Sequence, residues 1–293
     1  MPDTEVVAST IHHEEAGRGD PIVFLHGNPT SSFLWRDVIP QVSTIGRCLA
    51  PDLIGFGRSG KPDIAYRFED HLRYMDAWFD ALELARVTLV GHDWGGAIGF
   101  DWAARHPGRV RSIAFMETIV RPMRWDEGFS PEGREIFKAF RSPEGDKLIL
   151  DDNFFVDVFI PLGIKRRLSD DEMAVYRAPF REREHRRPVL AFPRDLPMEG
   201  EPRDVCARVA SYAEWLCASS NVPKLLLTFD PGAVMPEPVV AWCRENVAAL
   251  EIEHIGAGIH YVQEDHGPAI GRAIASWMQR HEVGDLSPRG SVT

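Results

Sequence analysis

Cysteine is scarce in this chain, and positively charged residues are outnumbered by negatively charged ones. The 293 residues contain four cysteines with no C-x-x-C pair among them: Cys48, Cys206, Cys217 and Cys243. Such usage indicates neither a disulfide framework nor a zinc site. Lysine and arginine total 33 against 44 aspartate and glutamate, a net charge of −11. This balance argues against nucleic acid and anionic membrane surfaces as partners.

Long hydrophobic runs are also missing. Residues 1–15 are acidic and polar, unlike a signal peptide, and no apolar run approaches the roughly 20 residues of a membrane span. A cytoplasmic location is therefore expected. The hydrophobic content of 44% and charged content of 26% are ordinary for a globular protein. The length fits one large domain, or a core with an inserted subdomain.

The chain instead shows an alternation of short apolar runs and helical patterns. Runs typical of strands occupy 22–25, 47–53, 87–90, 110–116, 224–229 and 250–255. Periods typical of helices lie between them, and a turn is expected at 256–258. This order predicts the α/β class, with a mostly parallel, doubly wound sheet.

The alternation stops between residues 120 and 205, which predicts an inserted, mostly helical cap. Breaks are expected in it at six prolines: Pro143, Pro161, Pro179, Pro188, Pro193 and Pro197. The predicted organisation is a first core part at 1–119, the cap at 120–205 and a second core part at 206–283. Residues 284–293 are expected to be a disordered tail.

One stretch carries the clearest chemical signal. After the apolar run at 87–90 comes GHDWG (91–95), and then a small-residue helix at 97–104. A strand, a sharp glycine-pinned turn and a helix form the nucleophile elbow of the α/β-hydrolase fold. Lipases and esterases have serine at its centre, where this chain has Asp93. A carboxylate there would attack carbon and form an ester on the enzyme.

Three further polar residues follow other predicted strands: Asn28, Glu117 and His260. Sites in such sheets lie at the carboxyl ends of the strands, so these side chains are expected to meet Asp93. His260 suits a base that activates water, with a carboxylate to orient it. The candidates for that acid are Glu117 and, after the seventh strand, Asp230.

Asn28 and Trp94 offer side-chain N–H donors beside the elbow. Two fixed donors would stabilise a leaving anion, by about 3 kcal/mol for each well-placed donor. The backbone N–H groups of the same two residues are expected to form the oxyanion hole during ester hydrolysis.

These motifs resemble the haloalkane dehalogenases over about residues 20–280. The matching stretches are HGNPTSS (26–32), PDLIGFGRS (51–59), GHDWGG (91–96), NFF (153–155), FPRDLP (192–197) and GIHYVQED (258–265). The resemblance implies a haloalkane substrate with water, a halide product, and no cofactor or metal. It also implies Asp93 as nucleophile, His260 as base, and Asn28 with Trp94 on the halide. It places Gly232 where related enzymes often keep the acid, which favours Glu117 over Asp230.

Two other enzyme classes remain open at this stage. Epoxide hydrolases share the elbow and use two lid tyrosines, for which Tyr176 and Tyr212 are the candidates, but they usually have an aromatic residue in place of Asn28. Luciferase-like monooxygenases resemble the same stretches. A non-enzymatic binding relative is also conceivable on this fold, although nucleophile, acid and base are all present here.

Several residues near the motifs have a structural interpretation. His26 and His92 are expected to satisfy backbone groups rather than to take part in chemistry. Five phenylalanines of the insertion are candidates to line an apolar pocket: Phe154, Phe155, Phe159, Phe180 and Phe192.

Overall fold

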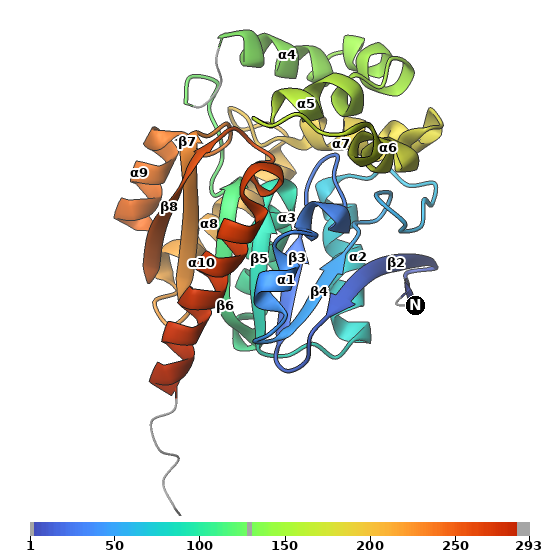
Figure 1. The fold of residues 1–293 in the computed structure, drawn as a ribbon. Coiled ribbons are helices and arrows are strands. Elements are labelled where there is room, and N and C mark those ends of the chain that lie inside the picture. The colour runs from blue at the N-terminus through green and yellow to red at the C-terminus, as the bar shows by residue number, and fades with distance from the viewer. Residues whose placement is uncertain (1–2, 128–130, 286–293) are drawn as a thin grey trace, which may run out of the picture.

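A computed structural model describes residues 3–127 and 131–285, and its centre is one eight-stranded sheet (Figure 1). The strands lie in the order β1-β2-β4-β3-β5-β6-β7-β8. They are β1 (Asp3–Val6), β2 (Ser9–Ala16), β3 (Pro21–Leu25), β4 (Arg47–Pro51), β5 (Val87–His92), β6 (Val110–Thr118), β7 (Lys224–Pro231) and β8 (Leu250–Gly258). Only the β1/β2 and β2/β4 pairs among these strands are antiparallel. The mostly parallel sheet is as predicted.

Helices of very different length connect the strands. The α-helices are α1 (Ile39–Val42), α2 (Phe68–Ala81), α3 (Asp93–Arg105), α4 (Pro131–Arg141), α5 (Ile160–Leu162), α6 (Asp170–Arg177), α7 (Arg187–Asp195), α8 (Arg203–Ala218), α9 (Glu237–Asn246) and α10 (Val262–Asp285). Short 3-10 or π turns are η1 (Ser32–Trp35), η2 (Pro107–Arg109), η3 (Asp146–Asp151), η4 (Phe155–Phe159), η5 (Ala178–Phe180) and η6 (Glu184–Arg186). Most of the predicted disordered tail lies outside the described residues, but positions 284 and 285 end α10.

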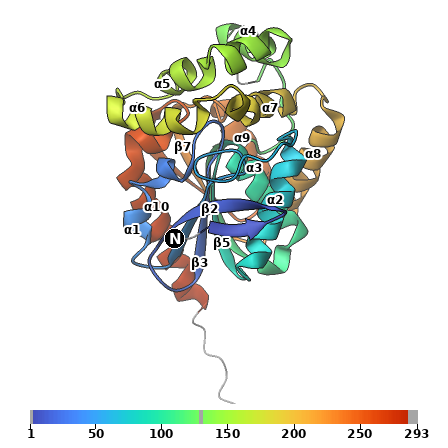
Figure 2. The same ribbon diagram turned by 90° about the vertical axis from the view of Figure 1, so that its right-hand side faces the viewer.

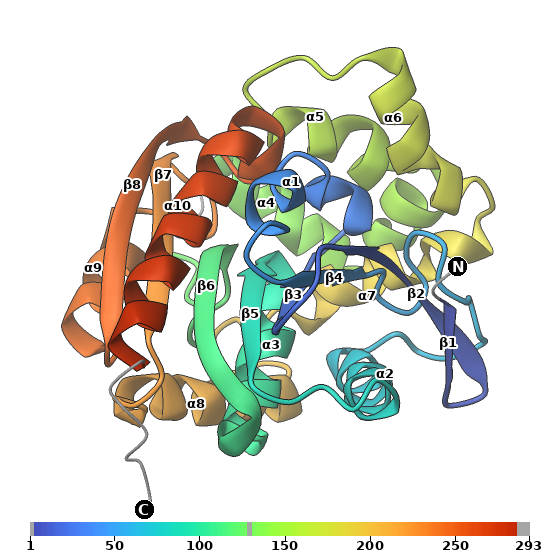
Figure 3. The same cartoon turned by 60° about the horizontal axis from the view of Figure 1, so that its bottom comes forward.

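Two hydrophobic cores sandwich the sheet. On one face, η1, α1 and α10 pack against the strands, with Trp35 of η1 and Ile270 and Trp277 of α10 in this core (Figure 3). The other face is covered by α2, α3 and α8, where Trp78 and Tyr212 are buried. Each fully buried aliphatic or phenylalanine side chain of these cores contributes about 1.5–3 kcal/mol, so both faces stabilise the sheet. No helix within the described ranges is long and apolar enough to cross a membrane.

The helices α4 to α7 form a layer above the carboxyl ends of the parallel strands, here called the helical layer (Figures 1 and 2). In the sequence, the helical layer is an insertion between β6 and α8. One prediction about it was wrong, because Pro193 does not break the chain but lies inside α7. Four residues before Pro193, the Val189 carbonyl accepts from the side chain of Asn28 at 3.1 Å.

The prediction of a turn at 256–258 was also wrong. β8 continues through it and pairs with β7 as far as Gly258 opposite Pro231. The register shifts after Thr228, and Gly256 stands opposite Phe229 with φ +151°. A glycine at a bulge keeps the strand paired where another residue would strain it. His260 therefore follows the strand end after one residue.

The elbow between β5 and α3 leaves no space for an additional side chain at Gly95. Asp93 takes φ +51°, a left-handed conformation that non-glycine residues rarely adopt. The first turn of α3 packs so closely on β3 that a Cβ on Gly95 would lie 2.2 Å from the Leu25 carbonyl oxygen and 2.3 Å from that of His26. Both neighbours are backbone atoms that cannot rotate away.

We therefore expect Gly95→Ala to destabilise the fold by about 1–3 kcal/mol, because the overpacked elbow must shift. Urea unfolding measures this difference. Gly108→Ala is the matched control, since a Cβ there meets nothing within 4 Å, and it should stay within about 0.5 kcal/mol of the parent. Equal stability of the two variants would contradict the steric argument.

Candidate active site

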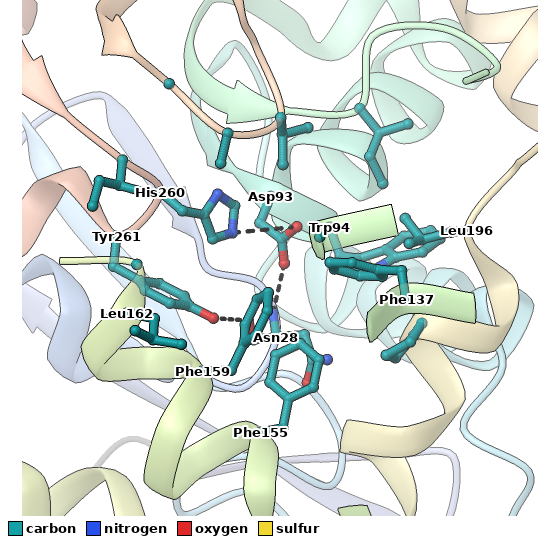
Figure 4. A pocket seen from close by; sticks show the side chains of 18 of the residues that line it. Asn28, Asp93, Trp94, Phe137, Phe155, Phe159, Leu162, Leu196, His260 and Tyr261 are labelled. Atoms are coloured by element: carbon teal, nitrogen blue, oxygen red, sulfur yellow. Dashed lines mark hydrogen bonds and ion pairs between the residues drawn. The ribbon is translucent and has the colours of Figure 1, made fainter. Parts of the chain in front are cut away.

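Asp93 lies at the top of the sheet with its carboxylate almost enclosed. The backbone N–H groups of Asn28 and Trp94 donate to it, that of Asn28 to Oδ2 at 2.7 Å (Figure 4). These are the two groups predicted as the oxyanion hole. Gly27 makes the contact possible, because a Cβ there would lie 2.2 Å from Oδ2. The backbone N–H of Asn28 thus holds Oδ2.

His260 faces the other carboxylate oxygen of Asp93. Its Nε2 lies 3.8 Å from Asp93 Oδ1, and its Nδ1 lies 3.4 Å from Glu117 Oε2. The surrounding loop is fixed by the helical layer, since the N–H groups of His260 and Tyr261 both donate to the Gly163 carbonyl at 3.0 Å. The imidazole is therefore aligned between two carboxylates.

Glu117 belongs to β6 but is held by the loop that follows β7. Its carboxylate accepts hydrogen bonds from the backbone N–H groups of Ala233 and Val234 at 2.9 Å, and of Met235 at 3.3 Å. A Cβ on Gly232 would lie 2.7 Å from Glu117 Oε1, so this position must be small. The rival Asp230 is exposed on the strand end. The structure thus brings Glu117, and not Asp230, beside His260.

The electrostatics of the group follow from burial and close charges. Burial lowers the pKa of His260, but the hydrogen bond to Glu117 and the charges of Asp93 and Glu117 outweigh it, so the net pKa is raised. Burial raises the pKa of Asp93, opposed by His260 and by the N–H groups of Asn28 and Trp94. His260 is consequently well suited to accept and hold a proton between the two carboxylates.

A cavity of about 330 Å³ opens above Asp93 (Figure 4). Its walls are mostly apolar and come from both the core and the helical layer: Ile119, Met123, Phe137, Phe155, Phe159, Leu162, Pro193, Leu196, Val234 and Ile259. The polar side chains that reach it are those of Asn28, Asp93, Trp94, His260 and Tyr261. Such a cavity suits a small apolar molecule that carries one reactive group.

The Trp94 ring is fixed by its aromatic neighbours. Phe192 stacks on it with ring centroids 4.9 Å apart, and Phe68 packs against it at 5.2 Å. Of the five phenylalanines considered from the sequence, Phe155 and Phe159 line the cavity. Phe192 does not line it and instead stacks on the Trp94 ring. Phe154 and Phe180 are outside the cavity wall. Sequence reasoning missed Phe137, whose helix gave no signal that it faces the site.

Tyr261 was also missed as a functional position. Its hydroxyl donates to the Asn28 carbonyl at 3.1 Å, which links the residue after His260 to the loop after β3. The signal in the sequence that could have identified Tyr261 is its position directly after His260. His26 and His92 bind the backbone as predicted: His26 Nε2 accepts from the Leu53 N–H at 2.9 Å, and His92 Nε2 lies 2.9 Å from the His260 carbonyl.

Comparison with known proteins identifies the family. A family model described as alpha/beta hydrolase fold matches residues 20–142. A haloalkane dehalogenase of Mesorhizobium japonicum is 50% identical over 277 residues, which cover 93% of this chain and 89% of that protein. This chain belongs to the haloalkane dehalogenase family. A second haloalkane dehalogenase, from Sphingobium indicum, is 45% identical and covers 94% of both chains.

Solved structures of the haloalkane dehalogenase family share the whole architecture. Haloalkane dehalogenase DbeA from Bradyrhizobium elkani superimposes with a TM-score of 0.94 at 46% identity, covering 97% of this chain and 98% of that one. DatA from Agrobacterium tumefaciens gives a TM-score of 0.91 at 43% identity, with coverage of 95% and 96%. The likeness therefore includes the helical layer as well as the sheet.

For this member of the dehalogenase family, the geometry predicts that Glu117→Gln lowers kcat at least about 100-fold, because the imidazolium loses its charged partner. The raised pKa of His260 predicts that activity falls with decreasing pH as His260 becomes protonated, at a pH above the ordinary histidine value of 6.5. Glu117→Gln removes a negative charge, so it should lower that pKa and move the acid limb to lower pH. A pH–rate profile of halide release measures both effects.

Asp230→Asn is the control for this prediction. Asp230 is exposed on the strand end, so its variant should keep the rate and the acid limb of the parent. The opposite ranking of the two variants would assign the acid to Asp230.

Proposed function

We propose that this chain hydrolyses carbon–halogen bonds of small haloalkanes to an alcohol, a halide ion and a proton. The observation that carries this proposal is the composition of the cavity: one buried carboxylate, Asp93, faces an apolar space that also contains the N–H-bearing side chains of Asn28 and Trp94. A neutral substrate with a leaving anion fits that arrangement, because it needs a nucleophile at carbon and neutral donors at the halogen.

In the first step, Asp93 attacks the carbon that bears the halogen. A bond forms from a carboxylate oxygen to carbon while the carbon–halogen bond breaks, and its electron pair leaves with the halide. Oδ1 is the attacking oxygen in this proposal, since Oδ2 is held by the Asn28 N–H. The side-chain N–H groups of Asn28 and Trp94 stabilise the charge that develops on the halide.

In the second step, water attacks the carboxyl carbon of the ester. His260 Nε2, 3.8 Å from Asp93 Oδ1, takes the proton from that water. The negative charge of the tetrahedral intermediate then forms on Oδ2, which accepts from the backbone N–H of Asn28, and the backbone N–H of Trp94 donates to the same carboxyl group. On collapse the bond from the carboxyl carbon to the alkyl oxygen breaks, and the leaving alkoxide takes the proton of the hydroxyl that came from the water. Asp93 is thereby restored as a carboxylate, and the proton on His260 passes to solvent.

The structure gives little support to epoxide opening. Tyr212 donates its hydroxyl to the Ile119 carbonyl at 2.6 Å, and Tyr176 donates to the carboxylate of Glu264. Neither Tyr176 nor Tyr212 belongs to the described residues that line the cavity. A pair of lid hydroxyls to activate an epoxide oxygen is thus not available from these two positions.

The proposed reaction predicts bromide release from 1-bromobutane or 1,2-dibromoethane, which ion chromatography measures. Release should continue without oxygen, which distinguishes hydrolysis from the monooxygenase alternative. Asp93→Ala should abolish release, because no other carboxylate among the described residues reaches the cavity. An epoxide opened in place of bromide release would contradict the proposal.

His260→Ala should separate the two steps. Ester formation needs only Asp93 and the donors, whereas hydrolysis needs the base, so the alkyl-enzyme should accumulate. Mass spectrometry of the peptide that contains Asp93 should show the added alkyl group within one turnover. A peptide of unchanged mass, from a variant that still consumes substrate, would exclude the covalent mechanism.

A further inference from the structure

The backbone of His260 lies beyond the part of the sheet that is paired. Pairing between β7 and β8 ends with Gly258 opposite Pro231, and α10 begins at Val262. Two hydrogen bonds hold the peptide groups of His260 in this gap. Its N–H donates to the Gly163 carbonyl of the helical layer at 3.0 Å, and its carbonyl oxygen lies 2.9 Å from Nε2 of His92.

The His92 ring is the donor in the second of these bonds. A carbonyl oxygen only accepts, so Nε2 of His92 must carry a hydrogen. Burial, together with the charge of His260, lowers the pKa of His92 well below the ordinary histidine value, so the ring is neutral. Its Nδ1 is buried without a hydrogen-bond partner among the described residues. The bond to His260 is therefore what fixes the tautomer and the ring.

His92 is the last residue of β5, directly before the nucleophile. It is buried and stands opposite Met116 of β6, and the next residue, Asp93, accepts from the Thr118 hydroxyl through its carbonyl at 2.6 Å. One rigid segment thus carries both the nucleophile and the donor that binds the backbone of the base. The separation of 3.8 Å between His260 Nε2 and Asp93 Oδ1 depends on both.

We propose that His92 is a positioning residue for the base. Its Nε2–H holds the carbonyl of His260 and so keeps the His260 imidazole at the distance from Asp93 where it activates water. His92 acts through His260, since it is not among the described residues that line the cavity. The proposal rests on the proposed function, in which His260 serves only the second step.

A matched pair of variants tests the donor. Glutamine and methionine have side chains of equal length, but only glutamine offers an N–H near the place of His92 Nε2. We expect His92→Met to release the first equivalent of bromide from 1-bromobutane at the parent rate and then to hydrolyse the ester about 10- to 100-fold more slowly. His92→Gln should hydrolyse it within about threefold of the parent rate. Rapid-quench bromide release and the mass of the peptide that contains Asp93 measure the two steps.

Two further variants control for folding and packing. His92→Asn gives a second test should methionine prevent folding, because its shorter amide does not reach the His260 carbonyl and should slow hydrolysis as well. His13→Met makes the same change at another buried histidine, which packs against Trp78 outside the cavity wall, and should leave both steps unchanged. Equal hydrolysis rates in His92→Met and His92→Gln would overturn the proposal, as would an equal slowing of both steps in His92→Met.

A readout without substrate separates this proposal from the proposed function. The titratable groups that face the His260 ring are Asp93, Glu117, His92 and Tyr261, and the two carboxylates raise its pKa. If the loop is released, the ring moves away from Glu117. The pKa of His260, measured by NMR titration of its Cε1–H, should therefore fall toward 6.5 in His92→Met and His92→Asn and stay raised in His92→Gln.

Replacing His92 changes no charge directly, because its ring is neutral. An unchanged His260 pKa in His92→Met and His92→Asn would overturn the positioning role, whatever the parent does with 1-bromobutane. A parent chain that releases no bromide would overturn the proposed function alone, while the titration would still decide whether His92 positions His260.

Discussion

The burial of the Asp93 carboxylate is the constraint on which the site depends. An ionised carboxylate in an apolar interior is costly unless hydrogen bonds and an opposite charge compensate it. Here the backbone N–H groups of Asn28 and Trp94 and the nearby His260 do so. This requirement explains why Gly27 has no side chain and why the elbow keeps a left-handed residue. The loop after β3 and the turn after β5 are thus one structural unit.

The charges of the site also explain its donors. Two carboxylates, Asp93 and Glu117, surround a single imidazole, so the resting site carries no surplus of positive charge. A fixed cation at the halide position would pair with Asp93 and weaken it as a nucleophile. In the proposed reaction, the neutral N–H groups of Asn28 and Trp94 would stabilise the leaving anion without that effect. Neutral donors are therefore a consistent choice beside a carboxylate nucleophile.

The helical layer takes part in the site and does more than cover it. The Gly163 carbonyl fixes the backbone of the His260 loop, and the Val189 carbonyl fixes the Asn28 amide. A cluster of ion pairs also joins the helical layer to the core. The buried carboxylate of Glu264 accepts from Arg36 at 2.6 and 2.7 Å and pairs with Arg166 of the segment before α6. The helical layer and the core therefore together fix the positions of His260 and Asn28.

The sequence by itself determined the order of strands and helices, the elbow with Asp93, and the strand-end positions of Asn28, Glu117 and His260. These depend on local patterns: apolar runs, glycine-pinned turns and short motifs. It left the choice between Glu117 and Asp230 to the resemblance. The geometry favours Glu117, because three backbone N–H groups after β7 hold its carboxylate and its Oε2 lies 3.4 Å from His260 Nδ1. Only the tertiary structure could also show that Pro193 lies inside a helix and that the Val189 carbonyl of this helix accepts from the Asn28 side chain. Such contacts join segments more than a hundred residues apart, and no local pattern encodes which donor will reach which acceptor.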